Sequence, residues 1–198
     1  MMKKLISLLL IFAMMAAMLA GCGSKTPETP EAEQPTETTP VVAVPGSALE
    51  ILETVWALYG EDEKFPVVGG DMNNMVDGAP GSFAVTDAEG LAYYFYLLEE
   101  QIANVDDAAS MLHGMMLNNF TCGVFHVKED AEGFAKVLQQ TLEDNQWICG
   151  MPEKMVIAVI GGEYVLMTFG INDAVNPFEA KLQQAYPEAQ IICSQAIA

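Results

Sequence analysis

Strand and helix patterns alternate in a fixed order between residues 120 and 196, and this order constrains the fold most. Apolar runs bounded by turn signals predict four strands, and apolar residues at helical spacing predict two helices. The strands are 120–127, 155–160, 163–169 and 190–196, and the helices are 131–147 and 172–186. Gly161-Gly162 separates the middle strands and is typical of a two-residue hairpin turn. The predicted order is therefore β-α-β-β-α-β.

This order matches the split β-α-β, or ferredoxin-like, arrangement. We therefore expect an α+β fold in which helices bury one face of an antiparallel sheet. Upstream, residues 61–85 are rich in Gly, Asp, Asn and Pro and indicate a loop with short extended pieces. Residues 105–117 are ambiguous, and we favour an extended segment over 107–113.

Two helices are predicted before this region. A Ser-x-x-Glu capping box at Ser47 begins a helix over 47–60, and a Thr-x-x-Glu box at Thr86 begins a helix that continues to about Glu99. Both helices can pack around the sheet. Residues 46–198 contain no second linker and no internal repeat, so we expect one globular domain.

The N-terminal residues have the pattern of an export signal. A basic pair at residues 3 and 4 precedes an apolar run over 5–19, which is short for a helix that spans a membrane. The motif LAGC follows over 19–22 and resembles the lipobox of bacterial lipoproteins. The resemblance implies a signal peptide over 1–21, cleavage between Gly21 and Cys22, and a diacylglycerol anchor, with fatty acids such as palmitate, on the Cys22 sulfur.

Residues 22–45 are expected to form the lipidated start of the chain and a spacer. Prolines recur through this segment between Thr and Glu residues, and it contains no aromatic residue. Such a composition predicts a disordered tether with polyproline II character. The folded domain would then stand away from the outer face of the bacterial cytoplasmic membrane.

The charge of the chain excludes some partners. The 198 residues include 8 Lys, no Arg and 27 acidic residues, for a net charge of −19. Loss of the signal peptide removes two lysines and brings the net charge to −21. Nucleic acid is therefore not an expected partner, and attachment to anionic lipid should depend on the acyl chains. The acidity is typical of a soluble, solvated surface, and binding of cations or of a basic partner is the alternative. The partner left open is a protein or a small molecule.

The cysteines and histidines give no clear metal site. Cys122, Cys149 and Cys193 remain after lipidation, as buried thiols or with one disulfide among them. On a strand, Cys122 and His126 share a face but lie about 13 Å apart, too far to hold one metal ion, although His113 could approach either. We predict no metal site and no cofactor.

No motif for nucleotide binding, serine hydrolysis or metalloproteolysis is present. The segment Asp71–Gly78 resembles a calcium loop in composition only, because an EF-hand position that needs an oxygen donor holds Met75. Tyr93, Tyr94 and Tyr96 could line a ligand groove, while helical spacing directs part of this cluster toward the core.

Residues 46–198 also resemble a group of small lipoproteins of Gram-positive anaerobes whose C-terminal domain has no assigned function. The stretches that carry the resemblance are ALYGEDEKFP, VDDAASMLH, FTCGVFHVK and QWICGMPEKMVIAVIGGEYVLMTFG. The resemblance implies a single extracytoplasmic domain and transfers no catalytic residue.

These observations predict a lipid-anchored, extracytoplasmic binding module without enzymatic activity. The alternatives are an enzyme of the cell envelope, built from residues distant in sequence, and a small solute-binding lipoprotein. The second is disfavoured because 153 residues are few for two lobes around a cleft.

Overall fold

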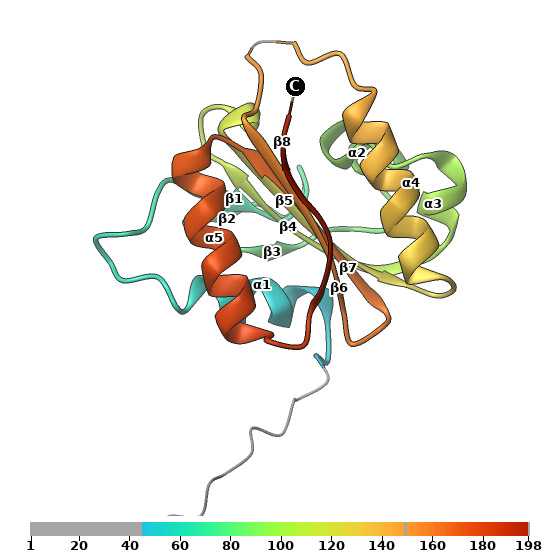
Figure 1. Ribbon diagram of the computed structural model, residues 1–198, viewed down its shortest axis with the longest axis horizontal. Coiled ribbons are helices and arrows are strands. Elements are labelled where there is room, and N and C mark those ends of the chain that lie inside the picture. The colour runs from blue at the N-terminus through green and yellow to red at the C-terminus, as the bar shows by residue number, and fades with distance from the viewer. Residues whose placement is uncertain (1–44, 149, 198) are drawn as a thin grey trace, which may run out of the picture. The chain divides into compact units, whose positions relative to one another are not determined.

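The structure is a computed structural model that describes residues 45–148 and 150–197. Over these residues the chain forms an antiparallel sheet of eight strands and five α-helices (Figure 1). The strands are β1 Val67–Gly69, β2 Val76–Asp77, β3 Gly81–Ser82, β4 Val105–His113, β5 Phe120–Val127, β6 Lys154–Ile160, β7 Tyr164–Gly170 and β8 Gln190–Ala196. The helices are α1 Ala48–Trp56, α2 Ala88–Phe95, α3 Glu99–Ala103, α4 Ala131–Glu143 and α5 Asn172–Ala185, with a 3₁₀ turn at Leu117–Asn119. The predicted α+β class is confirmed.

The helices cover both faces of the sheet, so the prediction that they lie on one face is wrong (Figure 1). One core cluster packs α1 and α5 against the sheet, and the other packs α2 and α4 against the opposite face. Neighbouring strand residues alternate between them: Val124 belongs to the first cluster and Phe125 to the second. The strands β6 and β7 are buried along nearly their whole length, which requires cover on both faces.

The ferredoxin-like arrangement is not confirmed, because the last strand lies at a different edge. The sheet order is β2-β1-β4-β5-β7-β6-β8, with β3 paired to β4. In the ferredoxin-like order the last strand returns beside the first strand of the motif, here β5. Instead β4 occupies that side of β5, and β8 pairs with β6.

The position of β8 explains why α4 and α5 lie on opposite faces. The connection from β5 through α4 to β6 crosses over the strand β7, which lies between them. The connection from β7 through α5 to β8 likewise crosses over β6, and both run in the same direction across the sheet. The starting strands β5 and β7 are antiparallel. Two right-handed crossovers in one direction from antiparallel strands must lie on opposite faces.

The second predicted upstream helix ends earlier than expected, at Phe95, and a further short helix, α3, was not predicted. The chain leaves α2 at Tyr96, whose φ of 59° is left-handed, and α3 begins three residues later. The Tyr96 ring packs against Trp147 and Phe169, so this turn brings an aromatic side chain onto the sheet. The side chain that caps α2 is Asp87, which accepts the Gly90 N–H, and not the predicted Thr86.

The β4 strand confirms the extended segment favoured over 107–113. The turn between β6 and β7 is one residue longer than predicted, because Ile160 pairs with Tyr164. Gly161 and Gly162 both have positive φ, and Glu163 completes the turn. The Glu163 carbonyl accepts the Val127 N–H at 2.8 Å, which ties the turn to the end of β5.

Candidate functional site

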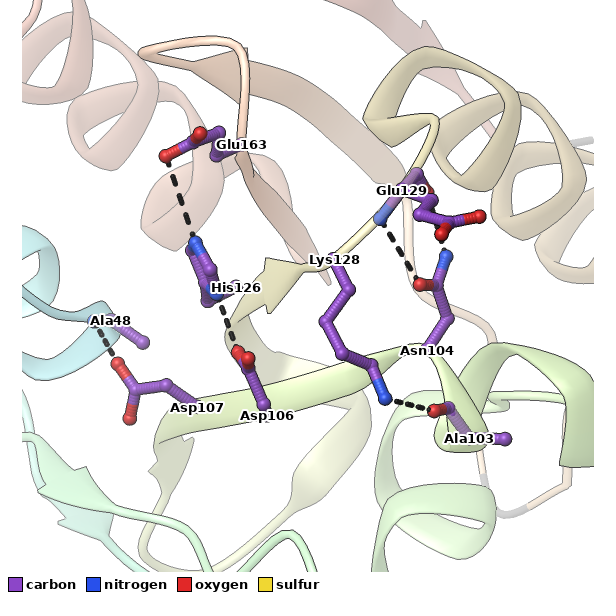
Figure 2. A network of polar contacts seen from close by, with 9 residues as sticks. All are labelled: Ala48, Ala103, Asn104, Asp106, Asp107, His126, Lys128, Glu129 and Glu163. Atoms are coloured by element: carbon purple, nitrogen blue, oxygen red, sulfur yellow. Dashed lines mark hydrogen bonds and ion pairs between the residues drawn. The ribbon is translucent and has the colours of Figure 1, made fainter.

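A cluster of titratable side chains lies where β4 begins, β5 ends and the β6–β7 turn closes (Figure 2). His126 Nδ1 lies 2.5 Å from Asp106 Oδ1, and His126 Nε2 lies 3.7 Å from Glu163 Oε2. Asp106 stands at an irregularity in the β4–β5 register, which turns its carboxylate toward the ring. The cluster therefore places one imidazole between two carboxylates from different segments.

The hydrogen bond with Asp106 is the main cause that raises the pKa of His126, and Glu163 adds to it while burial opposes it. In the protonated ring both N–H groups face carboxylates, so no ring nitrogen offers a lone pair to a substrate. The Tyr164 ring lies 4.9 Å from the His126 ring. Burial is the main cause that raises the pKa of Tyr164, and nearby carboxylates add to it. This geometry favours a fixed ion-pair role for His126 over general base catalysis.

Other polar groups around this cluster stabilise the junctions between elements (Figure 2). Asp107 Oδ2 accepts the Ala48 N–H at 2.7 Å and thereby caps the first turn of α1. Asn104 bonds the Glu129 main chain with both ends of its amide, and Lys128 Nζ donates to the Ala103 carbonyl at 2.6 Å. We call this end of the sheet, which carries Asp106, Asp107, Glu129 and Glu163, the acidic end.

The three predicted groove tyrosines make different ring contacts, and the groove itself stays a prediction. Tyr93 is exposed and its ring lies 5.0 Å from that of Tyr94, which also packs against Phe83. The Tyr96 ring packs against Trp147 and Phe169. Burial is the main cause that raises the pKa of Tyr96, and Tyr93 adds to it, so the two side chains are still neighbours.

The histidine and cysteine candidates are also separate. His113 Nδ1 accepts the N–H groups of Met115 and Met116 at 3.2 and 3.3 Å, so it stabilises a turn. Among residues 45–148 and 150–197, no three His, Cys, Asp or Glu side chains are grouped to hold a metal ion. Cys122 and Cys193 are buried in the clusters on opposite faces, which prevents a disulfide between them. Cys149 lies outside the described residues.

Asp71, in the loop that resembles a calcium site in composition, is a buried structural acceptor. Its carboxylate accepts the N–H groups of Asn73, Asn74 and Ala84 at 2.8 to 3.1 Å. Burial raises the pKa of Asp71, but these hydrogen bonds together outweigh it and lower the pKa overall. The carboxylate is therefore occupied by donors within the protein.

Sequence reasoning missed a surface at the opposite end of the sheet. Met115 and Ile148 are 81% and 78% exposed, and Met116 and Met151 are about half exposed. We call these four residues the methionine end. The sequence signal was the absence of charge, because residues 108–127 and 145–152 contain no Asp, Glu, Lys or Arg.

Two loops that are distant in sequence form the methionine end, and specific hydrogen bonds hold both. Asn118 Nδ2 donates to the carbonyls of Ile148 and Gly150, at 2.9 and 2.5 Å, which joins the β4–β5 loop to the α4–β6 loop. The bonds to His113 fix the turn that carries Met115 and Met116. Met115 and Met116 are therefore held by His113, and Ile148 by Asn118.

The predicted signal peptide, the cleavage site at Gly21 and Cys22, the lipidated Cys22 and the tether as far as residue 44 lie outside the described residues. Within the described ranges, none of the helices has both the length and the apolar character needed to cross a membrane. No known protein family matches the chain, and searches of curated proteins and of solved structures found no match.

Proposed function

We propose that the chain is a lipid-anchored protein of the outer face of a bacterial membrane and acts, without catalysis, by binding a partner protein through the methionine end. The lipobox-like motif at residues 19–22 supports the anchor. Two long acyl chains would contribute on the order of 20 kcal/mol of membrane affinity, enough for stable attachment.

The observation that carries the binding role is the exposed apolar end of a strongly acidic chain. Large apolar side chains exposed on adjoining segments without charge are typical of protein contacts, since charged residues are depleted at the centre of interfaces. Three of the four side chains are methionines, which adapt to partners of different shape. The bonds of Asn118 to Ile148 and of His113 to Met115 hold these residues before binding, which lowers the entropy cost of association.

The binding role can be tested by photo-crosslinking in cells of the natural host. A benzophenone amino acid replaces Met115 in one strain and Ile148 in another, and the control strain carries it at the half-exposed Gln139 on α4. The proposal expects one shared crosslinked partner from the first two positions and none from Gln139. Equal products from all three positions, or no product from Met115 and Ile148, would contradict it.

The anchor needs a separate test. Growth with a palmitate analogue should label the wild-type chain and leave Cys22→Ser unlabelled, and the wild type should remain in the membrane fraction after a high-salt wash. Label on the Cys22→Ser chain, or release of the wild type by salt, would contradict the lipid anchor. Neither result would affect the crosslinking test of the binding role.

A further inference from the structure

A groove between α3 and the first half of α4, at the acidic end, combines an apolar floor with a negative rim. We define the acidic groove by Leu98, Phe134 and Val137 on its floor and by Glu100, Glu129 and Asp130 on its rim. We propose that this groove binds a basic segment of a partner protein, in which an apolar side chain lies between lysines or arginines. This contact is separate from the one proposed for the methionine end.

Two adjoining hollows make up the acidic groove, and Glu100 lines both. The hollow between α3 and α4 has a volume of about 150 Å³ and is lined by Phe134 and Val137. The other extends along α3 past Leu98. Leu98 and Val137 are 42% and 40% exposed, so two apolar side chains remain in water unless a partner covers them.

Hydrogen bonds of Gln101 and Asn104 hold the backbone segments that line the acidic groove. Gln101 is buried, and its amide donates to the Phe134 carbonyl at 3.2 Å and accepts the Leu98 N–H at 3.1 Å. Asn104 holds the main chain of Glu129 in the same way, as Figure 2 shows. A ligand would therefore meet a preformed surface, and binding would need little rearrangement.

The rim carboxylates lack partners of opposite charge. Among the described residues, no lysine or histidine lies within ion-pair distance of Glu100, Glu129 or Asp130. Lys128 is the neighbouring cation, and its ammonium is directed to the Ala103 carbonyl at the end of α3. Asp130 caps α4 by accepting the Gly133 N–H at 2.9 Å, so Glu100 and Glu129 are the rim carboxylates that complementary charge on a ligand would meet without first breaking an ion pair.

The combination of apolar floor and negative rim selects the class of ligand. An uncharged apolar ligand would remove water from the carboxylates without compensation. A bare metal ion would lack a grouped set of three ligands among the described residues. A basic segment with an apolar side chain satisfies both parts, since its cations face the rim and its apolar group covers Leu98 and Val137.

The test measures binding of the fluorescent peptide KLKKLK to the full processed chain in a non-ionic detergent, with KGKKGK as the peptide without apolar side chains. Glu100→Gln with Glu129→Gln should weaken KLKKLK binding by roughly tenfold. The control pair, Glu53→Gln with Glu89→Gln, has the same net charge and should change the affinity less than twofold, or about 0.4 kcal/mol.

Val137→Ser should reduce the preference for KLKKLK over KGKKGK while leaving binding of KGKKGK unchanged. Equal weakening by the two glutamate pairs would show attraction to net charge alone and would overturn the proposal. Equal affinity of the wild type for the two peptides, or no binding of KLKKLK, would also overturn it. Circular dichroism of each variant separates a loss of fold from a loss of binding.

Discussion

At the residue scale, His126 makes the stability of the folded chain depend on pH. Its folded-state pKa lies above the unfolded value of about 6.5, chiefly because of the hydrogen bond with Asp106. Its contribution to stability is therefore complete below about pH 6.5 and is lost as the pH rises through the folded-state pKa. We predict that His126→Gln lowers the free energy of unfolding more at about pH 6 than at about pH 9, measured by urea denaturation.

Asp106→Asn provides the matched control for this prediction. It keeps the shape of the side chain but removes the charge that raises the pKa of His126 most. In the Asp106→Asn background, His126→Gln should therefore show a smaller difference between the two pH values. An unchanged difference would assign the pH dependence to another group.

At the element scale, Gly123 allows α2 to pack onto β5. A Cβ atom at Gly123 would lie 2.6 Å from Phe125 Cζ and 2.8 Å from Phe95 Cδ1, closer than packed atoms approach. We predict that Gly123→Ala lowers the free energy of unfolding by roughly 1–3 kcal/mol, since the Phe95 and Phe125 rings must move. Gly114→Ala is the control, because its nearest atom would be the Pro66 oxygen at 3.7 Å.

A double-mutant cycle assigns this cost to a specific contact. In a Phe95→Leu background the smaller side chain leaves room, so Gly123→Ala should cost less than it does in the wild type. The same cost in both backgrounds would mean that the clash with Phe95 does not limit stability. Urea denaturation of the four chains supplies the measurement.

Local patterns predicted the elements of the C-terminal half well, and the reason is physical. The strands at 120–127 and 190–196 were predicted with the bounds they have, because apolar residues and turn signals are local. The position of β8 depends on which edge remains open. The edge beside β5 is not open, because β4 pairs there. The ambiguous sequence pattern of β4 did not indicate this pairing.

The candidate surfaces could not be predicted for a similar reason. Met115 and Ile148 each look like ordinary apolar loop residues, and only the sheet and Asn118 bring them together. Leu98 and Val137 became groove residues because the chain turns at Tyr96, where a continuous helix was expected. Surfaces made from segments distant in sequence depend on strand order, which local patterns do not specify.

At the scale of the whole molecule, charge is distributed unevenly and is mostly of one sign. From residue 46 onward the chain contains 23 acidic residues and 5 lysines. The methionine end lies in segments without charge, whereas Asp106, Glu129 and Glu163 gather at the acidic end. Repulsion among like charges therefore opposes the compact state.

Salt should consequently stabilise this protein. At 0.1 M ionic strength the screening length is about 10 Å, which weakens repulsion between exposed carboxylates more than it weakens partly buried ion pairs such as Lys154–Glu179, at 2.6 Å. We predict that raising NaCl from about 10 to 300 mM increases the free energy of unfolding by about 1 kcal/mol, or roughly 2–4 °C in Tm. Calorimetry at fixed pH measures this shift. The double variant Glu53→Gln with Glu89→Gln should have a higher Tm at low salt and a smaller increase in Tm with NaCl. A fall in the Tm of the wild type with NaCl would mean that attractive ion pairs outweigh the repulsion.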